Sequence, residues 1–147
     1  MSKIIRVLAV VLCAVLLCTA LVGCASGPKD GTYTARYENA SHGYVEYLTV
    51  TFEGGEVVAA EYDAYVDGDP SAKKSAATPE EYPMDPPPSE WIPQISENVV
   101  KAGTNPDAID TVAGATYASA SARELYAAIL EAAAEGNTAE IVVPNEG

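Results

Sequence analysis

The segment with the clearest chemical potential is Asp110 to Tyr117, which reads Asp-Thr-Val-Ala-Gly-Ala-Thr-Tyr. Gly114 and Ala115 keep side-chain bulk away from the backbone, and Thr116 is placed to cap the helix that we expect to follow. The first turn of a helix offers free N–H groups and the positive end of the helix dipole. The segment therefore predicts a phosphate-binding turn, although such a turn is more often purely structural.

The same segment also carries a family resemblance. Gly114-Ala115-Thr116 at a helix start, with Asp110 upstream and Asp30-Gly31-Thr32-Tyr33-Thr34 opening the domain, is similar to the FMN-binding domain family. The resemblance spans roughly residues 30–134 and includes the hairpin sequence at 52–58. At 41–44 and 61–63 it extends to a lipoprotein branch described as membrane-anchored major immunogens.

This resemblance implies FMN as the cofactor, a membrane redox partner, and a threonine, here Thr116, that a flavin transferase can esterify to the FMN phosphate. Asp110 would position the loop. The family usually has Ser where this chain has Ala113, and small hydroxyl residues where it has Tyr117-Ala118. Covalent FMN, non-covalent FMN and no flavin therefore remain alternatives. The cofactor-binding residues expected are Asp110, Ala113, Gly114, Ala115, Thr116, Tyr117 and His42.

Other chemistries have weaker support. His42 is the only histidine, so a Ser-His-Asp hydrolase would have to use it, but a loop histidine between Ser and Gly is more often a turn residue. With one histidine and no cysteine beyond Cys24, zinc is nearly excluded. Asp67-Gly68-Asp69 lacks the spaced ligands and closing Glu of a calcium loop, and we interpret it as a solvated acidic turn.

The N-terminus has the layout of a lipoprotein signal peptide over residues 1–23. A short basic start precedes an uncharged stretch from Val7 to Val22. Leu21-Val22-Gly23-Cys24 then resembles the bacterial lipobox, in which the chain is cut before the cysteine and Cys24 carries lipid. An uncleaved membrane helix is the alternative. Both interpretations place the remainder, after a tether at 24–29, at the outer face of the cytoplasmic membrane or on the periplasmic or cell-surface side.

The charge balance limits the possible partners. The 147 residues include 8 Lys and Arg against 21 Asp and Glu, a formal net charge of −13. Removing Lys3 and Arg6 with the leader leaves 6 basic residues (8 less 2) and a net charge of −15. Nucleic acid is thus not expected as a partner, because its binding depends on basic residues that neutralise phosphates.

The remaining sequence predicts a single α+β domain at 30–136, in which a small antiparallel sheet packs against two or three helices. A turn at Glu53-Gly54-Gly55 joins two strands, and prolines and acidic residues predict an irregular surface loop at 67–89. The expected elements are a meander of strands at 30–37, 44–52 and 56–65, helices at 90–101, capped by Ser89, and from Thr116 or Tyr117 to Ala134, and an edge strand at 141–143 within a tail at 137–147.

Two hypotheses about function follow, with a weaker third. The first is an FMN-binding, membrane-anchored lipoprotein that carries electrons, in which the flavin performs the redox chemistry. The second is a flavin-free surface lipoprotein that uses the same fold for ligand binding or adhesion. The third is a membrane-tethered hydrolase that would depend on His42.

Overall fold

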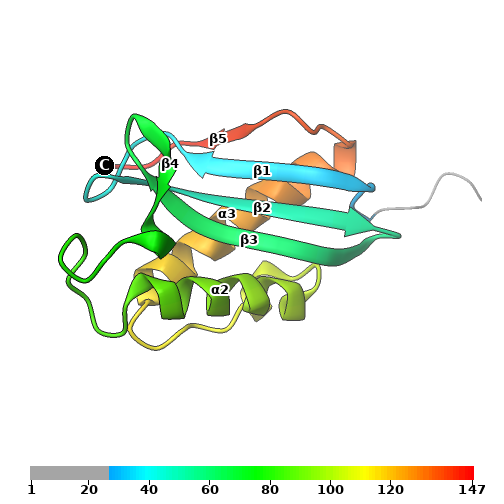
Figure 1. The fold of residues 1–147 in the computed structure, drawn as a ribbon. Coiled ribbons are helices and arrows are strands. Elements are labelled where there is room, and N and C mark those ends of the chain that lie inside the picture. Colours follow the sequence, from blue (N-terminus) through cyan, green and yellow to red (C-terminus); the bar gives the residue numbers. More distant parts are fainter. Residues whose placement is uncertain (1–26) are drawn as a thin grey trace, which may run out of the picture.

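Five strands form a mixed sheet in the computed structural model, which describes residues 27–147 (Figure 1). The predicted signal peptide and Cys24 lie outside the described residues. The strand order is β4-β3-β2-β1-β5. Neighbours among β1 to β4 run antiparallel, which confirms the predicted meander, whereas β5 pairs parallel with β1. The strands are β1 (Gly31–Tyr37), β2 (Tyr44–Glu53), β3 (Glu56–Val66), β4 (Asp69–Lys73) and β5 (Ile141–Val143).

The β2–β3 hairpin separates a buried face of the sheet from an outer one. Leu48, Val50 and Phe52 are fully buried on one face, as their alternation predicts. On the other face threonines pair across β1 and β2, where the hydroxyls of Thr34 and Thr49 lie 2.8 Å apart. This asymmetry shows which face the helices must cover.

Helices α2 (Pro88–Ala102) and α3 (Thr116–Glu135) cover the buried face, with α2 along β3 and α3 crossing behind β1 and β2 (Figure 1). The α3 stripe fits the predicted helical spacing, and Leu125, Tyr126 and Ile129 are fully buried in the core. Gly136 ends α3 in the left-handed conformation, and Gly103 ends α2. Short 3-10 turns, η1 (Lys74–Ala76) and η2 (Pro106–Ala108), complete the elements.

The segment 67–89 is more ordered than predicted. It contains β4, which pairs with β3, and the turn η1, whose first residue Lys74 is buried. The prediction of an irregular loop is therefore wrong for residues 69–76. A five-residue edge strand with little apolar alternation gives no period for the sequence to reveal.

Both predicted helix caps are also wrong. Helix α2 begins at Pro88 after Pro87, and no side chain caps it; a proline at the first helical position already has the required φ and has no N–H to leave without a partner. Helix α3 has Ala115 at the capping position and Thr116 as its first helical residue, again without a side-chain cap. The first turn of α3 is thereby left with its N–H groups free.

Candidate functional site

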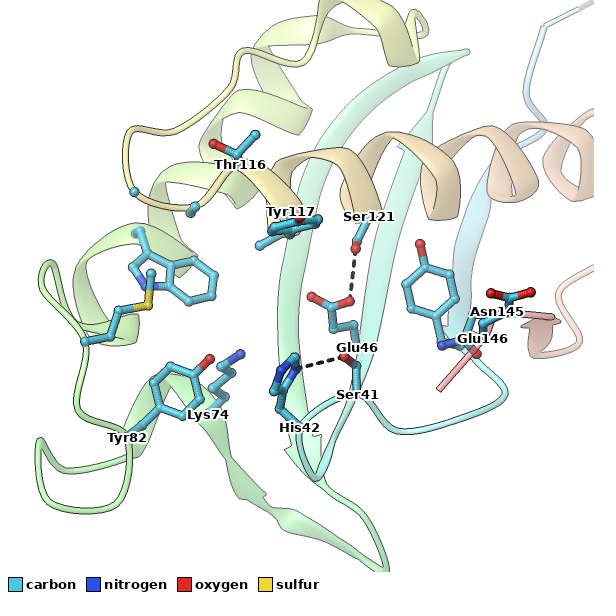
Figure 2. Close-up of a pocket in the computed structure, with 16 residues that line it drawn as sticks. Ser41, His42, Glu46, Lys74, Tyr82, Thr116, Tyr117, Ser121, Asn145 and Glu146 are labelled. Carbon is cyan, nitrogen blue, oxygen red and sulfur yellow. Dashed lines mark hydrogen bonds between the residues drawn. The ribbon is translucent and has the colours of Figure 1, made fainter.

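A pocket of about 580 Å³ lies at the N-terminal end of α3. Figure 2 shows how α3, the β1–β2 loop, η1 and the C-terminal segment surround it. Its volume is within the range typical of small-molecule sites. The lining residues are Tyr37, Ser41, His42, Glu46, Lys74, Tyr82, Met84, Trp91, Gly114, Ala115, Thr116, Tyr117, Ala118, Ser121, Asn145 and Glu146.

The start of α3 presents hydrogen-bond donors to this pocket. Within residues 27–147 no backbone carbonyl accepts from the N–H groups of Thr116, Tyr117 or Ala118, and no side chain caps the helix. The helix has 20 residues, so its dipole places a positive partial charge at this end. The arrangement is suited to a phosphate or another anion.

A buried serine and an arginine hold the turn before α3 in place. Ser119 is fully buried, and its Oγ accepts from the Val112 N–H at 3.0 Å and donates to the Ala115 carbonyl at 2.9 Å. Arg123 donates through two guanidinium nitrogens to the Ile109 carbonyl, at 3.0 and 2.6 Å. These bonds fix the turn from inside, so its donors are positioned before any ligand arrives.

Gly114 allows the turn to pass close to the segment that precedes α2. Its φ is +80°, and a Cβ there would lie 2.8 Å from Cδ of Pro86. Both the left-handed backbone and this close approach require glycine. The turn at Gly114 is therefore tied sterically to the segment that carries Tyr82 and Met84.

Lys74 occupies an aromatic box on another side of the pocket. Its Nζ lies 4.3 Å from the ring centroid of Tyr82, 5.2 Å from that of Tyr44 and 5.5 Å from that of Trp91. The residue is only 8% exposed, and within residues 27–147 its ammonium has no hydrogen bond or ion pair. The indole Nε1 of Trp91 is also buried without a partner in this part of the chain.

Glu46 and Tyr37 line another part of the pocket, and each is hydrogen-bonded to a residue outside the lining. Glu46 accepts from the Tyr62 hydroxyl at 2.5 Å and from Ser121 Oγ at 2.9 Å. Burial, with the neighbouring charge of Glu46, holds the pKa of Tyr62 well above its usual 10. Tyr37 donates to Glu124 at 2.5 Å, and burial followed by this bond raises its pKa in the same direction. These phenols therefore remain neutral donors at physiological pH.

His42 lies at the mouth of the pocket on the β1–β2 turn. Its φ is +52°, a left-handed conformation that histidine adopts more readily than most residues. Its Nδ1 lies 3.0 Å from Ser41 Oγ. Within residues 27–147 no carboxylate hydrogen-bonds to the ring, so the pair lacks the orienting acid of a hydrolase triad.

The C-terminal segment closes one end of the pocket. Asn39 and Asn145 are joined by three hydrogen bonds, two at 2.8 Å and one at 3.0 Å. Together with the pairing of β5 with β1, these bonds bring Asn145 and Glu146 to the pocket. The predicted tail thus forms part of the wall.

The structure brings most of the predicted cofactor-binding residues together. Gly114, Ala115, Thr116, Tyr117 and His42 all line the pocket, whereas Ala113 and Asp110 do not. The Asp110 carbonyl accepts from Asn98 Nδ2 at 3.1 Å, which anchors the backbone of the turn.

Sequence reasoning missed Lys74, Tyr82 and Trp91, which make up the aromatic end of the pocket. The sequence feature that could have indicated this end of the pocket is the pair of adjacent lysines at 73–74 in a strongly acidic chain. In residues 27–147, no group of three or more His, Cys, Asp or Glu side chains is arranged to hold a metal ion. None of the helices described there is long and apolar enough to span a membrane.

Comparison with known proteins connects the chain to lipoproteins. No family model matches it. The solved structure of the CPE2226 protein from Clostridium perfringens is similar, with a TM-score of 0.73 and 29% identity, over 81% of this chain and 99% of that one. The 15 kDa lipoprotein of Treponema pallidum (strain Nichols) is 31% identical over 134 residues, which cover 88% of this chain and 94% of that protein. The chain therefore belongs to the family of this 15 kDa lipoprotein.

Proposed function

We propose that this protein is a membrane-anchored, extracytoplasmic lipoprotein that binds FMN and carries electrons. The observation that carries the proposal is that the uncapped start of α3 opens into a pocket of about 580 Å³. Bound FMN would supply the redox chemistry, and the protein would hold and orient it.

The phosphate end of FMN fits the first turn of α3. The N–H groups of Thr116, Tyr117 and Ala118 are free, and Gly114 adds no side chain that would obstruct a phosphate. Because Ser119 and Arg123 already hold the turn, little conformational entropy is lost when an anion binds there.

The ring of FMN requires flat apolar surfaces and polar groups at its edge. Tyr82, Trp91 and Tyr117 supply aromatic surfaces around the pocket, and Lys74 supplies a charged donor without a partner in the described residues. The residues present thus suit both ends of the cofactor: donors for the phosphate at α3 and aromatic rings for the flavin.

Thr116 is accessible for covalent attachment. It is exposed, and in Figure 2 its side chain lies at the rim and points away from the space between Lys74 and Tyr117. A flavin transferase could reach such a hydroxyl, whereas in FMN held without a covalent bond the phosphate would contact only the backbone N–H groups at the start of α3. Covalent and non-covalent FMN are therefore alternative forms of the same proposal.

The proposal places the domain beside a membrane through a lipid on Cys24. With a net charge of −15 without its leader, the chain would be repelled by anionic lipid headgroups, so the lipid must provide the tether. A membrane redox partner would then reach the flavin at the open side of the pocket.

The test is to purify the full-length protein in detergent after expression with and without a flavin transferase. A mass increase equal to FMN less one water, lost in Thr116→Ala and retained in the exposed control Thr138→Ala, would support the covalent form. Saturable quenching of FMN fluorescence by unmodified protein would support the non-covalent form. If neither is seen, the FMN proposal is wrong.

That last outcome would favour the second candidate, a flavin-free surface lipoprotein for ligand binding or adhesion. Its supporting observation is Tyr117, which is 92% exposed at the position where the FMN-binding family usually has a small hydroxyl residue. An exposed tyrosine beside a pocket offers a large amphipathic ring to a binding partner.

A further inference from the structure

Lys74 differs from every other basic residue in the described chain. The residue is largely buried, and its ammonium has no hydrogen bond or ion pair, whereas each of the others within 27–147 has a polar partner. The partnered residues are Lys29, Arg36, Lys73, Lys101 and Arg123.

A shortage of carboxylates does not explain this isolation. The chain has 21 Asp and Glu residues, yet none in the described part lies within ion-pair distance of Lys74. The rings of Tyr82, Tyr44 and Trp91 attract the ammonium through cation–π contacts, but none of them neutralises its charge. A charge kept unpaired at a pocket wall is suited to a partner that arrives from outside.

The ammonium faces the pocket. Figure 2 shows Lys74 directed into the space between Tyr82, His42 and Tyr117, with Thr116 on the other side of that space. The pocket therefore has donors on two sides, the N–H groups of α3 and the Lys74 ammonium, with aromatic rings between them.

We propose that Lys74 is the specificity-determining residue of the pocket and recognises the carbonyl-rich edge of a flat heteroaromatic ring. This inference rests on the proposed function and deepens it, because it assigns the ring edge to Lys74 and the phosphate to α3. A cation beside ring carbonyls forms charge-assisted hydrogen bonds, and the Tyr82 ring, 4.3 Å from the ammonium, holds the cation at that wall of the pocket.

The two assignments are separated by comparing FMN with riboflavin, which has the same ring and no phosphate. Dissociation constants are measured by fluorescence titration of the full-length protein in detergent. Lys74→Met should weaken both ligands by the same factor, about 10-fold to 100-fold, the loss expected for hydrogen bonds from a charged group. Lys73→Met is the matched control: its neighbouring ammonium pairs with Glu61 away from this pocket, so neither affinity should change.

Each outcome has a distinct meaning. If the wild-type protein binds neither ligand, the proposed function and this inference both fail. If it binds FMN and Lys74→Met binds both ligands as the wild type does, the inference alone is wrong. If only the FMN affinity falls, Lys74 contacts the phosphate, and the assignment of the ring edge is overturned.

A second measurement needs no variant, so it tests the proposal even if circular dichroism shows that Lys74→Met does not fold. The wild-type protein is titrated with lumichrome, which keeps the carbonyl edge of the flavin ring, and with phenazine, a three-ring heteroaromatic without it. Recognition by Lys74 predicts at least 10-fold tighter binding of lumichrome. Equal affinities for the two rings would overturn the proposal.

Discussion

Replacing Gly114 by alanine tests whether the turn before α3 is held by the close approach that the structure shows. Gly114 has a φ of +80°, and an added Cβ would meet Pro86 Cδ at 2.8 Å and Cγ at 3.3 Å. The proline ring cannot rotate away, so either the turn or the segment before α2 must shift.

Two costs add at this position. An L side chain in the left-handed region loses about 1–2 kcal/mol of stability. Overpacking against a rigid neighbour costs a further ~1–3 kcal/mol. Gly114→Ala should therefore lower the free energy of unfolding by about 2–5 kcal/mol, towards the lower end if the partly exposed turn relaxes outward.

Gly68→Ala provides the matched control. Gly68 has a φ of +83°, and a Cβ there would have nothing within 4 Å, so only the backbone cost applies. We expect a loss of about 1–2 kcal/mol for this variant. The difference between the two variants measures the contact with Pro86.

The assay is urea unfolding followed by circular dichroism, with the midpoint and slope compared among variants. Adding Pro86→Ala should recover the contact cost, so the double variant should be less destabilised than the sum of the single variants by about 1–3 kcal/mol. The reasoning is refuted if Gly114→Ala costs no more than Gly68→Ala, or if the effects of Gly114→Ala and Pro86→Ala simply add.

Three further predictions concern the residues that support the pocket. Ser119→Ala should lower the free energy of urea unfolding by about 1–3 kcal/mol, because the buried N–H of Val112 loses its acceptor. Arg123→Met should cost about 1.5–3 kcal/mol in the same assay, since the Ile109 carbonyl loses both charged donors. Burial raises the pKa of Tyr126 from 10 to about 12, so the folded state holds this proton more tightly than the unfolded state. Below pH 10 the phenol is protonated in both states, so this group should not make the melting temperature depend on pH. As the pH rises from 10 towards 12, only the unfolded state loses the proton, and the melting temperature should fall, with a shallower fall in Tyr126→Phe.

The sheet and the long helix could be predicted because their patterns repeat. Alternation over Leu48, Val50 and Phe52 continues through a strand of ten residues, and the turn at 53–55 fixes its partner. The stripe on α3 extends over twenty residues. An error of one residue in where the strand or helix ends does not change the repeating pattern of apolar residues that identifies it.

The caps could not be predicted in this way, because each depends on which of several neighbouring residues is the first residue of the helix. Ser89 is a good capping residue by type, but Pro88 already satisfies the helix start one residue earlier. Thr116 was expected to cap α3 and instead begins it, since Ser119 bonds the turn from within the helix. The hydrogen bonds that hold this turn come from a serine three residues inside the helix, and the residue types at the helix start do not show them.

The pocket was predicted from the start of α3 and from His42, but not from its aromatic end. The residues from Gly114 to Tyr117 carry a local motif, whereas Lys74 reaches the pocket because the edge strand β4 pairs with β3 and η1 then turns inwards. Its position depends on pairing across the sheet, and Lys73, its neighbour in sequence, lies on a different surface. Of two adjacent lysines, one thus lines the pocket and the other pairs with a carboxylate on a different surface, and composition cannot distinguish them.

On the proposed function, the charge of the chain and the chemistry of the pocket act in opposite directions on FMN. The net charge of −15 repels a phosphate at long range, while the α3 N–H groups and Lys74 attract an anionic, carbonyl-bearing ligand only once it has arrived. Salt screens the first effect more than the second, so the association rate of FMN should rise with ionic strength rather than fall. A bond to Thr116 would remove this long-range penalty, because a tethered ligand has a high effective concentration at the pocket. An acidic surface domain therefore gains more from covalent attachment than a basic one would.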